Sequence, residues 1–225
     1  MSTRKLSPEY KLCERVRRKF REGIREFNLI TDGDHILVGC SGGKDSMALL
    51  QLLGEMKRYS KVDFQVTAVH IKNENIQYKS DTTYLSEFSS RFDIPFSFHT
   101  ISFLADEQQG RTPCFLCSWN RRKALFELAK DLGCNKIALG HHFDDVVETI
   151  LMGMIYGAQI QTMMPKLHST NFEGMELIRP LYKVKEKDII VRKNEEITVT
   201  ELERLDSGLV RINGGEENGG FDLVS

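Results

Sequence analysis

The stretch HILVGCSGGKDSMALLQLLGEMKR, residues 35–58, decides the predicted fold of this chain. Its first part, His35–Cys40, is a short apolar run that is typical of a buried strand, and the part from Asp45 to Arg58 is typical of a helix. The polar segment SGGKDS, residues 41–46, lies between them. In open α/β sheets, ligands bind at the carboxyl ends of strands, where a helix N-terminus offers free N–H groups. We therefore predict a phosphate-binding loop at residues 41–46.

The rest of the chain repeats this alternation of strand and helix. An amphipathic helix over Leu12–Phe27 comes first, with Ser7 as its cap and Pro8 at its first position. Further strands are predicted at 64–71, 95–101 and 136–140, and further helices at 80–91, 118–132 and 144–156. Such alternation implies parallel strands joined by right-handed crossovers. The predicted fold class is therefore α/β with a doubly wound parallel sheet.

The composition is that of a globular domain. The chain has 225 residues, 40% hydrophobic and 28% charged, which is enough to bury one sizeable core and a small appendage. No run approaches the roughly 18 apolar residues of a membrane span, and the first residues lack the apolar segment of a signal peptide. Five cysteines are too few for a disulfide scaffold. We therefore expect a cytoplasmic protein with no membrane segment.

Charge is distributed unevenly along the chain, although the formal net charge is −1. Residues 1–30 carry nine Lys or Arg against four Glu, whereas residues 194–225 carry eight acidic residues against two Arg. We predict a basic N-terminal helix (1–30), an α/β domain (31–189) and a divergent, acidic, Gly-rich tail (190–225) that packs loosely. Outside residues 194–225 the chain carries 29 basic and 24 acidic residues. This surplus of positive charge gives only weak support for a polyanionic partner, because most such surpluses are solvated surface.

The segment SGGKDS has the residue types that a phosphate site needs. Gly42 and Gly43 let the backbone curl around a phosphate, Lys44 supplies a positive charge, and Ser41 and Ser46 supply hydroxyls. The Walker A and dinucleotide-binding patterns are both absent. The competing interpretation is a plain glycine turn that closes the strand.

A second polar motif follows the predicted strand at 136–140. It reads ALGHHFDD, residues 138–145, and places Asp144 and Asp145 at a strand exit and helix start. Adjacent carboxylates there could hold Mg²⁺ against phosphates. The alternative is that Asp144 caps the helix and Asp145 complements its dipole. The pairing with SGGKDS favours the metal interpretation.

The third motif is the pair Cys114 and Cys117, followed by Arg121 and Arg122. Two cysteines at this spacing indicate a metal, an iron–sulfur cluster or redox chemistry, and two unconnected cysteines remain the alternative. A structural zinc site would need a second ligand pair, which the sequence lacks. The other cysteines, Cys13, Cys40 and Cys134, are interpreted as small buried residues.

SGGKDS resembles the PP-loop of the ATP pyrophosphatase superfamily. With the cysteine pair, LGHHFDD, and the later segments MPKL (164–167) and IRPL (178–181), the chain closely resembles the tRNA 2-thiocytidine synthetases, the TtcA family, from about Leu12 to Ile189. The resemblance implies a Rossmann-like domain of the adenine nucleotide α-hydrolase type. It also implies that ATP and Mg²⁺ activate a cytidine in the tRNA anticodon loop, after which sulfur replaces the adenylate with participation of an iron–sulfur cluster.

The resemblance also implies the site residues and the partners. Lys44, Asp45, Cys114 and Cys117 are expected to be catalytic, and a 4Fe–4S cluster is expected on the two cysteines. The partners are tRNA, a sulfur donor that is a cysteine desulfurase or sulfide, and a second copy of the chain. The residues expected to bind ATP are Ser41, Gly42, Gly43, Lys44, Asp45, Ser46, His70, Gly140, His141, Asp145 and Arg179, with Asp144 and Asp145 as ligands of Mg²⁺. Arg15, Arg17, Arg18, Lys19, Arg21, Arg121 and Arg122 are candidates for phosphate contacts.

One departure from the family leaves other functions open. The family holds its cluster with a third cysteine beyond the IRPL segment, whereas no cysteine follows Cys134 here. Two thiolates are too few for a 4Fe–4S cluster, so a third ligand would come from solvent, sulfide, another chain or Cys134. The alternatives are an adenylating ligase of the lysidine-synthetase type and a non-catalytic nucleotide- or RNA-binding protein.

Overall fold

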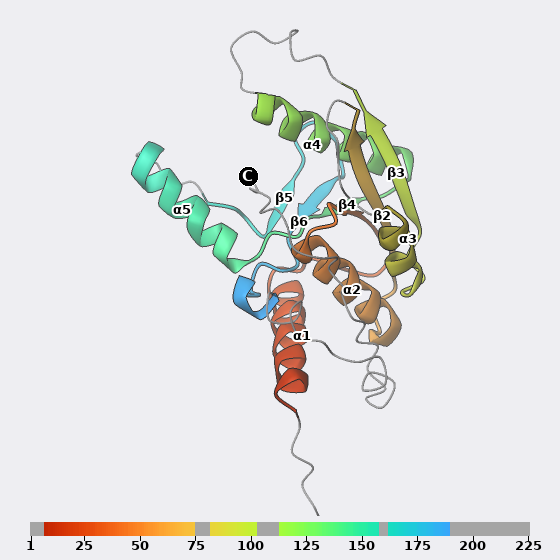
Figure 1. Cartoon of the computed structure of the whole chain (residues 1–225), viewed down its shortest axis with the longest axis vertical. Helices are drawn as coiled ribbons and strands as arrows, with labels where there is room; N and C mark the ends of the chain where they lie inside the picture. Colours follow the sequence, from red (N-terminus) through yellow and green to blue (C-terminus); the bar gives the residue numbers. More distant parts are fainter. Residues whose placement is uncertain (1–6, 75–81, 103–112, 158–161, 190–225) are drawn as a thin grey trace, which may run out of the picture.

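The computed structural model describes residues 7–74, 82–102, 113–157 and 162–189. Within these residues, six strands form one sheet in the order β3-β2-β1-β4-β6-β5 (Figure 1). All neighbours pair in parallel except the edge strand β5, which runs antiparallel to β6. The strands are β1 (Asp34–Gly39), β2 (Phe64–Asn73), β3 (Phe96–Ile101), β4 (Lys136–Ala138), β5 (Lys166–His168) and β6 (Glu176–Ile178).

Helices cover both faces of this sheet, which confirms the predicted doubly wound α/β class (Figure 1). One core joins side chains of α1, α2 and α3 to one face of the sheet. A second core joins side chains of α4 to the other face. The helices are α1 (Pro8–Glu26), α2 (Lys44–Tyr59), α3 (Thr82–Ser90), α4 (Pro113–Asp131) and α5 (Phe143–Gly157).

The predicted start of α1 is confirmed. Ser7 is the N-cap, and its hydroxyl accepts a hydrogen bond from the N–H of Tyr10 at 3.2 Å, while Pro8 occupies the first turn. The apolar face of the helix buries Val16 and Phe20 in the same core as the first strand. The basic N-terminal helix therefore packs directly onto the α/β domain.

Two elements differ from the sequence prediction. Helix α4 begins at Pro113, earlier than the predicted start at Ser118, so Cys114 and Cys117 lie in its first turns rather than before it. The hairpin of β5 and β6 was not predicted, because strands of three residues are too short to show an alternating pattern. The predicted tail, 190–225, lies outside the described residues.

The strand order marks one end of the sheet as the expected ligand-binding end. Strand β1 lies between β2 and β4, and its connection to β2 runs through α2 on one face, whereas α4 covers the other face before β4. The loops after β1 and β4 therefore lie next to each other at the carboxyl ends of these paired strands, where open α/β sheets bind ligands. Among the described residues, no helix is both long and apolar enough to cross a membrane.

Candidate active site

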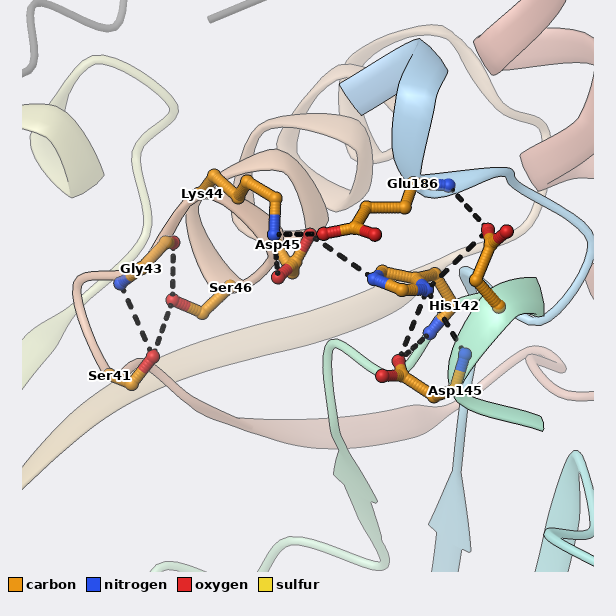
Figure 2. Close-up of polar contacts among 9 residues, drawn as sticks. Ser41, Gly43, Lys44, Asp45, Ser46, His142, Asp145 and Glu186 are labelled. Atoms are coloured by element: carbon orange, nitrogen blue, oxygen red, sulfur yellow. Dashed lines mark hydrogen bonds and ion pairs between the residues drawn. The ribbon is translucent and has the colours of Figure 1, made fainter. Parts of the chain in front are cut away.

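The loop between β1 and α2 is closed by hydrogen bonds that leave the start of α2 open (Figure 2). The hydroxyl of Ser46 donates to the carbonyl oxygen of Gly43 at 2.9 Å and lies 3.2 Å from the hydroxyl of Ser41. Gly42 has a φ of 86°, a left-handed conformation that favours glycine. Gly43 caps α2 without any side-chain hydrogen bond, so the first N–H groups of the helix face a ligand position.

Lys44, the first residue of α2, lies between two carboxylates. Its Nζ is 3.1 Å from Oδ2 of Asp45 and 3.0 Å from Oε1 of Glu186 (Figure 2). Burial lowers the pKa of Lys44, but its hydrogen bonds to Glu186 and Asp45 outweigh burial and raise that pKa overall. Lys44 therefore presents a positive charge beside the phosphate-binding loop.

The second motif forms a reciprocal cap at the start of α5. The backbone N–H of His142 donates to Oδ2 of Asp145 at 2.6 Å, and Nδ1 of His142 lies 3.4 Å from the backbone N of Asp145. This is the pattern of a capping box, with His142 as the N-cap. Asp144 instead accepts a hydrogen bond from the backbone N–H of Glu186 at 2.7 Å. Asp145 thus completes the capping box, and the Asp144 carboxylate anchors the segment that carries Glu186.

Gly140 allows the two motifs to approach closely. A Cβ atom at this position would lie 3.1 Å from the carbonyl carbon of Asp45 and 3.1 Å from the backbone N of Ser46. These atoms belong to the first turn of α2, which cannot shift as a flexible side chain could. A side chain at position 140 would therefore press on the backbone at the start of α2, whereas glycine leaves room for the close approach.

Asp45 carries an unsatisfied oxygen at this junction. Its Oδ1 is buried and has no hydrogen-bond partner among the described residues, and Nε2 of His142 lies 3.8 Å away. An unpartnered carboxylate oxygen beside a phosphate site suits Mg²⁺, which is usually bound by one or two carboxylates plus substrate phosphates. In the described part of the chain, no three His, Cys, Asp or Glu side chains come together as a complete metal site.

His141 and Arg179 lie at the carboxyl ends of the neighbouring strands β4 and β6. Burial lowers the pKa of His141 to about 4, and the positive charge of Arg179 makes the second largest contribution to this shift. Burial and the charge of Arg122 lower the pKa of Arg179 to about 10. Nδ1 of His141 and Nε of Arg179 are buried without hydrogen-bond partners among the described residues. The structure therefore brings two of the predicted ATP-binding residues close enough for the charge of one to act on the other.

His70 supports the loop from β2. It is buried, and its Nδ1 is 2.7 Å from the carbonyl oxygen of Cys40, so Nδ1 donates the proton. Burial lowers the pKa of His70, which keeps the ring neutral. Through this hydrogen bond His70 supports the backbone that precedes SGGKDS.

The cysteine motif is only partly described. Cys114 and Cys117 are three residues apart in α4, and positions with this spacing share one face of a helix. The side chain of Cys117 is half-buried, whereas the side chain of Cys114 lies outside the described part of the structure. Cys134 follows the opposite end of α4 and is buried, with its pKa raised by burial to about 11. The suggestion that Cys134 supplies a third ligand is therefore wrong.

Two residues of the site were not among those predicted. His142 stands in the quoted motif, and its place just before the helix could have suggested a capping role. Glu186 follows the start of α2 by more than a hundred residues and belongs to no recognisable motif. Only the folded chain shows that it contacts Lys44.

A glycine-rich loop after β1 and an acidic motif after the neighbouring strand β4 lie together at the carboxyl ends of a parallel sheet, which is where nucleotide-binding α/β proteins hold their ligands. The chain belongs to the PP-loop domain family, which its residues 12–201 match.

Relatives with curated names are similar to most of the chain. The tRNA-cytidine(32) 2-sulfurtransferase of Neisseria meningitidis serogroup A is 42% identical over 184 residues, covering 80% of this chain and 57% of the relative. The tRNA-cytidine(32) 2-sulfurtransferase of Aeromonas salmonicida is 39% identical over 184 residues, covering 80% of this chain and 60% of the relative. The predicted resemblance is confirmed, and the chain spans somewhat more than half the length of these relatives.

A solved structure shares the fold. The U34-tRNA thiolase NcsA from Methanococcus maripaludis, determined with its 4Fe–4S cluster, matches with a TM-score of 0.66 at 22% identity. The match covers 80% of this chain and 62% of the thiolase. It supports the predicted Rossmann-like fold of the adenine nucleotide α-hydrolase type.

Proposed function

We propose that this chain catalyses ATP-dependent thiolation of tRNA, by adenylation of a cytidine in the anticodon loop followed by sulfur transfer. The observation that carries the proposal is the meeting of SGGKDS with the HHFDD motif around Lys44 and Asp45, in a chain 42% identical to a tRNA-cytidine(32) 2-sulfurtransferase. The lysidine-synthetase type of ligase is not favoured, since these relatives are named sulfurtransferases. ATP, tRNA and a cytoplasmic location are all part of the proposal.

The chain's own residues suit the first half-reaction. The cytidine oxygen attacks the α-phosphorus of ATP, and pyrophosphate leaves. The open N–H groups at the start of α2 and the charged Lys44 would stabilise the departing pyrophosphate. To contact the pyrophosphate, Lys44 would exchange its ion pair with Glu186 for one with a phosphate oxygen. When bound, Mg²⁺ would neutralise phosphate charge, and the unpartnered oxygen of Asp45 suits it as a ligand. The backbone hydrogen bonds of Asp144 and Asp145 each use one carboxylate oxygen, and we propose the second oxygen of each as a further ligand of Mg²⁺.

The second half-reaction replaces oxygen by sulfur. A hydrosulfide attacks the activated carbon of the base, AMP leaves with the former carbonyl oxygen, and a proton is released. We propose that Cys114 and Cys117, which share one face of α4, bind the metal or cluster that delivers sulfur. The cluster of the thiolase with the same fold is in line with this role. Trp119 on the same helix is exposed and could stack on the unpaired base.

The two half-reactions can be tested separately. The chain is incubated with ATP, Mg²⁺, sulfide and unmodified tRNA, and both pyrophosphate release and thiolated nucleosides are measured. Lys44→Ala should abolish both, whereas Cys117→Ser should abolish thiolation and leave tRNA-dependent pyrophosphate release. Lys130→Ala, at an exposed position on α4, is the matched control and should change neither. Thiolation by the Lys44→Ala variant would contradict the assignment, and incorporation of an amine in place of sulfur would favour a ligase.

We further propose that two copies of the chain associate through α5. After Glu148 this helix carries no charged residue, and several of its apolar side chains are exposed, with Ile155 at 72% and Tyr156 at 83% exposure. Exposed apolar patches of this kind commonly mark interfaces. Light scattering should give a dimer for the wild type and a monomer for Ile155→Glu. A wild-type monomer at micromolar concentration would contradict this pairing.

A further inference from the structure

A hollow is lined by residues of α1, of the end of α2 and of the segments that precede β1 and β2. Its volume is about 620 Å³. Its floor is apolar, and its rim is formed by arginines of α1. The floor includes Ile30, Met56 and Val62, and the rim includes Arg18, Arg21 and Arg25.

The hollow is remote from the candidate active site. Ile30 and Val62 precede β1 and β2, so the hollow lies at the amino ends of these strands. The phosphate-binding loop follows the carboxyl end of β1. A strand of six residues spans roughly 20 Å, so the two sites are separated by about the depth of the sheet.

The three rim arginines share one face of α1. Their spacing of three and four residues repeats the helical turn and distributes the guanidinium groups over roughly 10 Å along the helix. All three are exposed. Arg18 and Arg25 form no ion pair with any described residue, and Arg21 has only a 3.9 Å contact with Glu14.

Other charged residues of α1 are already paired. Arg17 is turned inward and binds Glu55 at 2.8 Å and Glu14 at 2.9 Å, which argues against its predicted phosphate contact. Glu22, the acidic residue at the rim, is held by Lys183 at 2.9 Å and by Lys19 at 3.1 Å. Hydrogen bonds from these two lysines lower the pKa of Glu22 to about 2. The rim therefore keeps an uncompensated positive charge.

We propose that this hollow is a second RNA-binding site, in which Arg18, Arg21 and Arg25 contact the phosphate backbone of the RNA substrate and the apolar floor receives a ribose or an unpaired base. The inference rests on the proposed function for the identity of the RNA. Exposed arginines without a close ionic partner are suited to neutralise phosphates, and an apolar floor beneath them suits the less polar part of a nucleotide. A tRNA is an extended polyanion, so one molecule is long enough to contact both the hollow and the candidate active site.

The test compares variants of the full chain in binding fluorescently labelled, unmodified tRNA at several salt concentrations. Arg18→Gln with Arg25→Gln removes two backbone contacts, so the slope of log affinity against log salt should decrease by about 1.4 to 1.8. Arg18→Lys with Arg25→Lys should retain the slope, because charge is preserved. Arg91→Gln with Lys130→Gln removes the same charge at exposed positions outside the hollow and should also retain it.

Calorimetry and a second binding assay separate a role of the hollow in RNA binding from other causes of weaker binding. Calorimetry should give the same ATP affinity for all variants, because the hollow is far from Lys44. Equal slopes in the glutamine variant and the wild type, or an equal decrease in the Arg91 and Lys130 control, would overturn the proposal while leaving tRNA thiolation intact. A wild type that binds no tRNA would overturn both. Loss of binding to labelled polyglutamate, with tRNA binding unchanged, would assign the hollow to an acidic peptide and overturn the proposal.

Discussion

Replacing Gly140 by alanine tests whether the two motifs are held together by close backbone contact. The added Cβ would lie 3.1 Å from the carbonyl carbon of Asp45 and from the backbone N of Ser46. Comfortable contacts between carbon atoms are about 3.5–4.0 Å, so the junction must open by roughly 0.4 Å. Gly140 is not among the glycines with positive φ, so the expected effect is steric and involves no backbone strain.

The size of the effect follows from the rigidity of the surroundings. Ser46 and the next turns of α2 are buried in the core, so the helix has no space into which to move. Overpacking of this kind costs about 1–3 kcal/mol. Part of this cost should appear as a lower urea midpoint and the rest as weaker ATP binding. If nearly all of it falls on binding, the ATP affinity should decrease by up to about 100-fold, since 1.4 kcal/mol is a factor of ten.

Two measurements and one matched variant complete this test. Urea denaturation and ATP calorimetry are performed on Gly140→Ala and on Gly23→Ala. A Cβ at Gly23, in the interior of α1, would meet its nearest neighbours at an ordinary 3.6 Å. Gly23→Ala should therefore gain up to about 1 kcal/mol from helix propensity and bind ATP normally. Unchanged stability and unchanged ATP affinity in Gly140→Ala would refute the reasoning.

Three further outcomes are expected. Gly54→Ala, whose Cβ would meet Cβ of the buried Phe92 at 2.5 Å, should lose about 1–3 kcal/mol in urea denaturation, and a gain in stability would contradict the packing described. Because burial lowers the pKa of His141 to about 4 from 6.5, the unfolded chain takes up this proton first, so stability present above about pH 6.5 is lost as the pH falls toward 4. His141→Asn should lose less stability than the wild type over this interval, and equal losses would argue against a neutral, buried ring. Asp145→Ala removes the carboxylate of the capping box and should cost about 1 kcal/mol of stability, whereas Asp145→Asn keeps an oxygen that can accept the hydrogen bond. If Asp145→Asn loses Mg²⁺-dependent pyrophosphate release at near-normal stability, Asp145 is a metal ligand. Normal release would leave capping as its role.

The local pattern of the sequence was sufficient for the fold class and for the two motifs of the site. The apolar run before Ser41, the two glycines and the amphipathic residues after Lys44 each act within a few positions along the chain, where hydrophobic periodicity and backbone freedom are decisive. The same holds for Ser7 and Pro8 at the start of α1, which the structure confirms.

The tertiary structure decided which charges are satisfied and which are exposed. The sequence shows Arg17 and Arg18 as equivalent basic neighbours, yet Arg17 is paired in the interior with Glu55 and Arg18 lines an exposed hollow. Likewise, the contact of Lys44 with Glu186 joins residues far apart in the chain. The physical reason is that a charge's partner is set by distance in space, and the packing of helices on the sheet brings together residues whose spacing along the chain carries no signal.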